Sequence, residues 1–240
     1  MPDVAKALAI IQHTSSEYLG LIEDHLEGRR IRFHYFRPFT TGGRLPRITE
    51  ITDGLVLLGG GPWGCADGAS RLPWLEAESA LASAALAAGT PLIGFGLGAQ
   101  ILALAAGGTA APAPFSLEVG VATRTEPAFG GLLPARFPLV RYGRDAVALP
   151  GAARVLARDE QGRWALFQLG ERAFGFAGHP GTKTAIIEDL IMEFPEAPAG
   201  TAAALTELRS AQAPIEAALV PIMAGLTRAL GLMPQEPHGA

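Results

Sequence analysis

The sequence predicts an α/β fold with a mainly parallel sheet, because apolar strand-like runs alternate with amphipathic helix-like runs in its first half. An apolar run at 6–12 is followed by a helical pattern that ends at Gly28, and a second apolar run follows at 31–36. A strand–helix–strand unit favours parallel pairing of its two strands. After Gly108 the runs are shorter and are separated by glycine, proline and charged residues, which is typical of antiparallel hairpins.

The same patterns predict the remaining elements in order. The Thr-x-x-Glu sequence at 14–17 is a capping box, so the first helix is expected to start there. Further helices are expected at 72–88, 101–106, 184–194, 201–211 and 214–232. Further strands are expected at 53–58, from 91 onward, and at 119–123, 137–142, 154–157, 164–169 and 173–177.

Length and composition are those of an ordinary globular chain. A chain of 240 residues, of which 49% are hydrophobic and 18% charged, buries roughly 70–75% of its unfolded surface. No internal repeat and no low-complexity linker divides the sequence. We therefore expect a single domain over residues 1–232 and a disordered tail rich in proline and glycine at 233–240.

Charge and composition exclude several classes of partner. The formal net charge is −4, so we expect no nucleic-acid partner. Residues 79–117 carry no charge, but glycines and prolines interrupt this stretch, so no membrane partner is expected either. We find no secretory leader pattern and therefore expect a cytoplasmic protein. The single cysteine, Cys65, excludes an internal disulfide and a CxxC metal site, and fits a reducing compartment.

The segment 91–100, PLIGFGLGAQ, is the most informative part of the chain. A short apolar run stops at glycines and an apolar helical run begins, so a buried strand is expected to turn sharply into a helix. At such a junction the residue on the turn projects from the backbone, and the first amides of the helix point at whatever that residue holds. The residue at the tip is Gly96, which has no side chain.

Three blocks of sequence together resemble the class I glutamine amidotransferases, most closely the stand-alone branch that is similar to GMP synthase. They are DGLVLLGGGP at 53–62, the block from PWLEAE to AAGG at 73–108, and FGFAGHPG at 174–181. The resemblance extends over about residues 7–190. It implies a three-layer, flavodoxin-like α/β domain with a mainly parallel central sheet and a small antiparallel sheet, and no cofactor or metal.

The resemblance also implies a catalytic triad that is incomplete in this chain. In the family, a cysteine in Gly-x-Cys-x-Gly-x-Gln attacks the carboxamide of glutamine and forms a thioester, a histidine exchanges protons, and an acid orients the histidine. Here Gly96 stands at the cysteine position and Gly181 at the acid position, and only His179 is retained. Loss of the nucleophile typically costs about 10⁴ to 10⁶ in rate, so we expect no glutaminase activity.

Other family positions are retained. Backbone amides that hold the oxyanion are expected at Gly60 or Gly61 and at Leu97. The remaining residues that the resemblance places in the glutamine pocket are Gly98, Gln100, Glu118 and Gly120. The pocket itself is expected between Gly60, Gly96, Glu118 and His179.

Three hypotheses about function follow. The first is a degenerate amidotransferase homologue that binds a small, glutamine-like ligand, or regulates or assembles with a biosynthetic partner protein. The second is a working amidotransferase or hydrolase that uses His179 and a relocated nucleophile such as Cys65, which follows the Gly-Gly-Pro loop. The third is a purely structural subunit.

Overall fold

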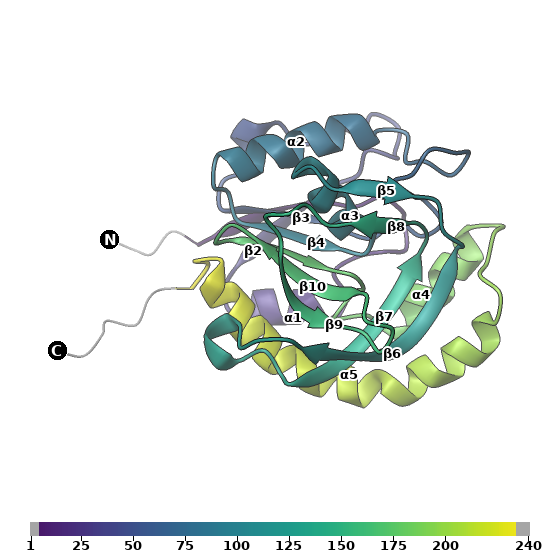
Figure 1. The fold of residues 1–240 in the computed structure, drawn as a ribbon. Helices are drawn as coiled ribbons and strands as arrows, with labels where there is room; N and C mark the ends of the chain where they lie inside the picture. The colour runs from purple at the N-terminus through teal and green to yellow at the C-terminus, as the bar shows by residue number, and fades with distance from the viewer. Residues whose placement is uncertain (1–4, 234–240) are drawn as a thin grey trace.

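A computed structural model describes residues 5–233, and a nine-stranded sheet with helices on both faces forms its centre (Figure 1). The strands are β1 Ala7–Ile11, β2 Arg32–Phe36, β3 Gly54–Leu57, β4 Leu92–Phe95, β5 Thr109–Ala111, β6 Ser116–Arg124, β7 Arg136–Gly143, β8 Ala146–Ala148, β9 Arg154–Arg158, β10 Trp164–Leu169 and β11 Ala173–Phe176. The order in the large sheet is β2-β1-β3-β4-β11-β10-β9-β6-β7, and β5 pairs with β8 in a separate sheet.

The large sheet has a parallel half and an antiparallel half. Strands β2, β1, β3, β4 and β11 pair in parallel, whereas β10, β9, β6 and β7 continue the sheet with antiparallel pairing. The two-stranded sheet of β5 and β8 is antiparallel. This arrangement confirms the predicted α/β fold with a parallel sheet and a small antiparallel sheet. Strands β5 and β8 were not predicted, because three residues are too few to give an alternating pattern.

Helices cover both faces of the sheet. They are α1 Leu21–Glu27, α2 Leu75–Ala87, α3 Leu97–Ala105, α4 Thr184–Glu193 and α5 Thr201–Ala229, with short 3-10 helices at Ile48–Glu50 and Phe129–Gly131. Figure 1 shows α2 and α5 on opposite sides of the sheet. Within residues 5–233, no helix combines the length and the apolar character needed to cross a bilayer.

The strand periodicity of two divides the core into two main layers. In β1, Leu8 and Ile10 pack with the apolar residues of α1 and α5, whereas Ala9 and Ile11 pack with those of α2 and α3. All four side chains are buried. Burial of a large aliphatic side chain contributes roughly 1.5–3 kcal/mol, so these two layers hold the helices on the sheet.

The first helix starts later than the capping box predicted. It begins at Leu21, after Gly20, whose φ is 60°. The hydroxyl of Thr14 does accept the N–H of Glu17 (3.1 Å), but this bond closes a turn and not a helix. The Glu17 side chain does not return to cap the turn and instead accepts the N–H of Gly61 (3.1 Å), so a tertiary contact overrides the local signal.

The two predicted C-terminal helices are one continuous helix. Helix α5 contains both Pro214 and Pro221. A proline inside a helix costs about 3 kcal/mol or more, since it removes one backbone hydrogen bond and crowds the preceding turn. Burial of Ile215, Leu219 and Ile222 on the sheet offsets this cost. Of the tail predicted at 233–240, only Met233 lies among the described residues, where its side chain packs against the core.

Candidate functional site

The turn between β4 and α3 forms a sharp strand-to-helix elbow, as predicted. Gly96 is at its tip with φ 53° and ψ −117°, a positive-φ conformation that favours glycine and costs other residues about 1–3 kcal/mol. The N–H of Gly96 donates to the carbonyl of Phe176 (3.0 Å), and the N–H of Gly98 donates to the carbonyl of Leu58 (2.9 Å). The tip of the elbow is therefore held between β11 and the residue that follows β3.

Glycines let α3 approach the sheet closely. A Cβ atom at Gly98 would lie 2.1 Å from the carbonyl oxygen of Leu57, and one at Gly94 would lie 2.5 Å from the carbonyl oxygen of Gly98. Contacts this short exclude any side chain. Gly98, expected in the pocket, thus has a packing role and does not line the cleft described below.

The tip of the elbow, where the resemblance expects the nucleophile, is open. A Cβ atom at Gly96 would have the Cα atom of Gly59 as its only neighbour within 4 Å, at an ordinary contact distance of 3.5 Å. The space for a cysteine side chain is therefore retained, while the thiol is absent.

His179 is buried, and both nitrogens of its ring have backbone partners. Nε2 donates to the carbonyl of Tyr18 (3.0 Å), and Nδ1 accepts the N–H of Gly181 (3.2 Å). The ring also packs on Phe95, with 5.1 Å between ring centroids. Burial lowers the pKa of His179 to about 4, although the bond to Tyr18 opposes this shift. At neutral pH the imidazole is uncharged, and neither nitrogen is free to serve a nucleophile.

The position of the missing acid is filled. A Cβ atom at Gly181 would lie 2.8 Å from Cγ1 of Ile22 and 3.2 Å from its backbone nitrogen, with Leu219 at 3.4 Å. Helices α1 and α5 therefore occupy the space that a glutamate side chain would need. The carbonyl of Tyr18 takes over the role of hydrogen-bond acceptor for the His179 ring.

Two of the three predicted oxyanion donors are unoccupied. Among the described residues, the backbone N–H groups of Gly60 and Leu97 have no hydrogen-bond partner. The N–H of Gly61 is already engaged, because it donates to Glu17. Gly60 and Leu97 are in direct contact, since a Cβ atom at Gly60 would lie 2.3 Å from the Leu97 side chain.

Gln100 and Cys65 form a structural bridge. The side-chain amide of Gln100 donates to the carbonyls of Arg144 (2.9 Å) and Asp145 (3.2 Å), and its oxygen accepts the thiol of Cys65 at 3.3 Å. Cys65 is buried, and this burial, together with the charge of Asp145, raises the pKa of its thiol to about 12. The thiol is therefore protonated at neutral pH, which is the unreactive form.

A cleft of about 460 Å³ opens beside the elbow. Gly96, Leu97, Gln100 and Glu118 line it, whereas Gly60 and His179, which were expected at the same pocket, do not. Its other walls come from the loop after β3, from β7, β9 and β10, and from the β7–β8 and β9–β10 turns. They contribute aromatic and arginine side chains: Trp63, Arg141, Tyr142, Arg144, Arg158, Arg163 and Trp164. The lining of the cleft therefore combines apolar and aromatic side chains with charged ones.

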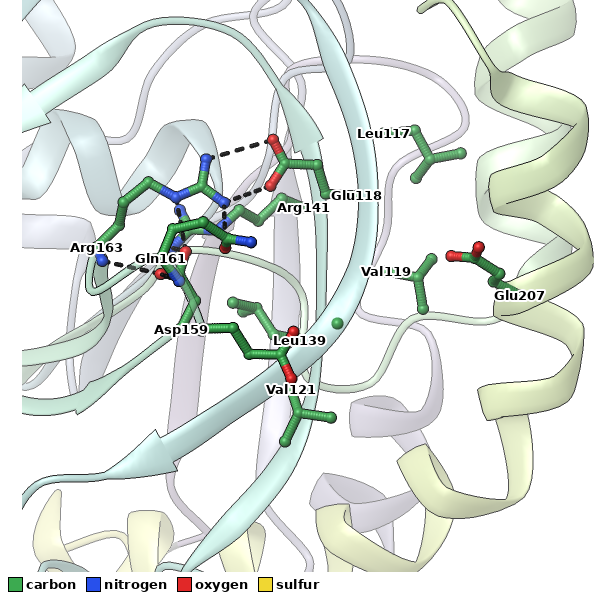
Figure 2. Close-up of a pocket in the computed structure, with 12 residues that line it drawn as sticks. Leu117, Glu118, Val119, Val121, Leu139, Arg141, Asp159, Gln161, Arg163 and Glu207 are labelled. Atoms are coloured by element: carbon green, nitrogen blue, oxygen red, sulfur yellow. Dashed lines mark hydrogen bonds and ion pairs between the residues drawn. The ribbon is translucent and has the colours of Figure 1, made fainter.

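A second cleft of about 280 Å³ adjoins the first, between β6 and α5 (Figure 2). Gly120 lines this second cleft and not the first. Arg163 donates to both carboxylate oxygens of Glu118 and to Asp159 (2.7 Å), and Arg141 donates to Asp159 at 3.2 Å. These ion pairs form the wall between the two clefts, because Glu118, Arg141 and Arg163 line both.

A buried polar cluster beneath the Gly59–Gly61 loop was not predicted as part of the site. His13 Nδ1 donates to the carbonyl of Gly59 (2.8 Å), and Nε2 contacts the carboxylate of Glu78 (2.9 Å). Burial alone would lower the pKa of His13, but Glu78 raises it above its ordinary value. Burial raises the pKa of Glu17 to about 7, against the opposing effect of the Gly61 N–H. The cluster holds the loop that carries the Gly60 amide.

Metal coordination has no support in the part of the chain that the structure describes. No group of three or more histidine, cysteine, aspartate or glutamate side chains is arranged there to hold a metal ion.

Comparison with solved structures gives the class of fold. A crystal structure of a glutamine amidotransferase from Methylobacillus flagellatus superposes with a TM-score of 0.79 at 24% identity, covering 98% of each chain. One from Thermotoga maritima superposes with a TM-score of 0.77 at 22% identity, covering 95% of this chain and 99% of the other. The chain therefore has a class I glutamine amidotransferase-like fold. No protein-family model and no curated protein sequence matches it.

Proposed function

We propose that this chain is an amidotransferase-like protein that does not hydrolyse glutamine and uses the cleft beside Gly96 to bind a small polar molecule. The observation that carries the proposal is the state of the elbow. The sharp turn is present, and the backbone N–H groups of Leu97 on the elbow and of Gly60 in the loop after β3 are unoccupied, but position 96 has no side chain. A cleft that is lined by the unoccupied Leu97 amide and has no nucleophile at position 96 supports binding and not covalent catalysis.

The two other triad positions support the same conclusion. His179 is uncharged, and both of its ring nitrogens are bonded to the backbone. The surroundings of Gly181 leave no room for an acid. Restoring catalysis would therefore need changes at three places, and not at one.

A relocated nucleophile at Cys65 has little support. A reactive cysteine needs a lowered pKa and access to substrate, whereas this thiol is buried, protonated at neutral pH and bonded to Gln100. Cys65 is better explained as part of the bridge between α3 and the β7–β8 turn.

The cleft favours binding over a purely structural role. A volume of about 460 Å³ lies in the usual range of small-molecule sites, roughly 300–1,000 Å³. Assembly with a biosynthetic partner protein stays a prediction in addition to ligand binding, since both roles are compatible with the same cleft.

Ammonia release from L-glutamine tests the proposal. Wild type, His179→Ala and Cys65→Ser are compared after circular dichroism has shown that each is folded. We expect all three to release ammonia at the same background rate. Turnover in wild type that either substitution abolishes would overturn the proposal and identify the residue responsible.

A further inference from the structure

The hydrogen-bonding groups left without a partner around the cleft are nearly all donors. Among residues 5–233, buried side-chain atoms without a partner include Nε of Arg141, Nε of Arg144 and the hydroxyl of Tyr142, and all three residues line the cleft. The N–H of Leu97 at the start of α3 is also unoccupied. Guanidinium and amide groups only donate, and the Tyr142 hydroxyl donates or accepts. The three side-chain atoms are themselves shielded from solvent, so they mark an excess of donors in the wall of the cleft, and the ligand is expected to meet this excess through the accessible donors beside them.

The two carboxylates of the cleft, by contrast, already accept hydrogen bonds from the protein. Asp145 accepts the backbone N–H groups of Cys65 (2.8 Å) and Ala66 (2.9 Å) through one oxygen and that of Ala113 (3.4 Å) through the other. Both oxygens of Glu118 accept from Arg163. A ligand amide or ammonium group would therefore compete for acceptors that are already in use.

Positive charge is in excess around the cleft. Four arginines and two carboxylates line it. In the described part of the chain Arg158 has no carboxylate partner, and its guanidinium donates to the carbonyl of Gly162 at 2.7 Å. The first turn of α3 contributes the positive end of a helix dipole beside the unoccupied Leu97 amide.

We infer that the cleft binds a small dicarboxylate, with one carboxylate at the start of α3 near Leu97 and the other at the arginines around Arg158, in preference to the neutral diamide of the same length. The inference rests on the proposed function, because it names the class of ligand for the same cleft. A carboxylate supplies acceptors only, so it suits the unoccupied Leu97 N–H and the arginine side chains without needing a protein acceptor in return. The amide has to place two N–H donors beside an excess of positive charge, where both carboxylates already accept hydrogen bonds.

The test compares binding of glutarate with that of glutaramide by isothermal titration calorimetry on the wild-type chain. The two probes have the same carbon skeleton and differ only in their terminal groups. We expect glutarate to bind at least about tenfold more tightly, the gain of one charge-assisted hydrogen bond over a neutral one. Equal affinity for the two probes, or binding of glutaramide alone, would overturn the inference, as would the absence of glutarate binding.

Substitutions on β9 locate the bound anion. Arg158→Gln removes a positive charge from the cleft, and Arg154→Gln removes one from the same strand outside it. Both side chains are exposed, so both variants are expected to fold. We expect about a tenfold loss of glutarate affinity in Arg158→Gln and less than a twofold change in Arg154→Gln. An equal effect of both substitutions would overturn the placement in this cleft.

The failure of this inference is distinguishable from that of the proposed function. If glutaramide and L-glutamine bind as well as glutarate and no ammonia is released, the cleft is a non-catalytic binding site but does not select anions. If ammonia is released from glutamine, the non-catalytic role itself is wrong, whatever the affinity for glutarate.

Discussion

The ring of His179 donates from Nε2 to the backbone carbonyl of Tyr18 across 3.0 Å, and this bond fixes the orientation of the buried ring, whereas burial keeps the ring uncharged. In a working triad a side-chain carboxylate orients the histidine and stabilises its charged form. A neutral carbonyl also orients the ring but stabilises its charged form much less, so burial lowers the pKa of His179 to about 4. The fold has kept the histidine as a packing and hydrogen-bonding residue.

Stability should depend on pH through His179. The folded-state pKa of about 4 lies below the ordinary 6.5, so the unfolded chain binds more protons between these values. The contribution of His179 to stability is complete above pH 6.5 and is lost as the pH falls toward 4, by up to about 3 kcal/mol. His179→Gln should remove this loss. Urea unfolding of wild type and His179→Gln at pH 7 and pH 5 measures how the free energy of unfolding changes with pH. An equal change in the two proteins would contradict the prediction.

Glu17 should have the opposite dependence. Its pKa is raised from 4.5 to about 7 by burial, so the folded chain holds a proton that the unfolded chain releases. The stability that this provides is present below pH 4.5 and is lost as the pH rises through 7. Glu17→Gln keeps the oxygen that accepts the Gly61 N–H and removes the titration. We expect the variant to gain about 1–3 kcal/mol over wild type between pH 5 and pH 8.

Chemical denaturation at pH 5 and pH 8 measures the difference in unfolding free energy between Glu17→Gln and wild type. Glu188→Gln is the control for removing one negative charge, because Glu188 is exposed and pairs with Arg209. A stability difference between Glu17→Gln and wild type that does not change with pH would show that Glu17 is ionised in the folded chain at all pH values tested.

Gly181 should not tolerate the missing acid. A side chain there meets Ile22 at 2.8 Å, and overpacking of this kind typically costs about 1–3 kcal/mol for each position. We expect Gly181→Glu to lower the thermal midpoint by more than about 8 °C, with a much smaller shift for the matched change Gly120→Glu, where the added Cβ atom has no neighbour within 4 Å. Similar midpoints for the two variants would show that α1 can move aside.

Cys65 should be unreactive in the folded chain. Its thiol is buried, its pKa is raised to about 12, and it donates to Gln100. A disulfide reagent at pH 8 is expected to modify it only after urea unfolding, and Cys65→Ser, which keeps a donor for Gln100, should leave ligand binding unchanged. Modification of the native protein within minutes would contradict the bridging role.

The parallel half of the fold was predictable because its signals are local. Each strand from β1 to β4 is an apolar run next to a glycine or a helical pattern, and the elbow at Gly96 lies between the last of these strands and α3. The continuous helix α5 was not predictable from the sequence, since the cost of Pro214 and Pro221 is offset by burial that only the tertiary structure provides.

The candidate site was predictable only in part, for a related reason. The resemblance located Gly96, Leu97 and Glu118, which line the cleft, but it also placed His179 there, and that ring is turned to Tyr18. The cluster of His13, Glu17 and Glu78 escaped prediction, because its contacts join residues up to 65 positions apart. Two carboxylates and a histidine on separate elements carry no local signal.

The most direct test of the central claim, that the elbow holds no nucleophile, is the intact mass of the chain after incubation with an electrophilic glutamine analogue. Gly96→Cys is the positive control, since an added side chain has space at the tip. We predict an unchanged mass for wild type under conditions in which Gly96→Cys gains one adduct. One adduct per wild-type chain, mapped to Cys65 or to any residue of the cleft, would contradict the claim.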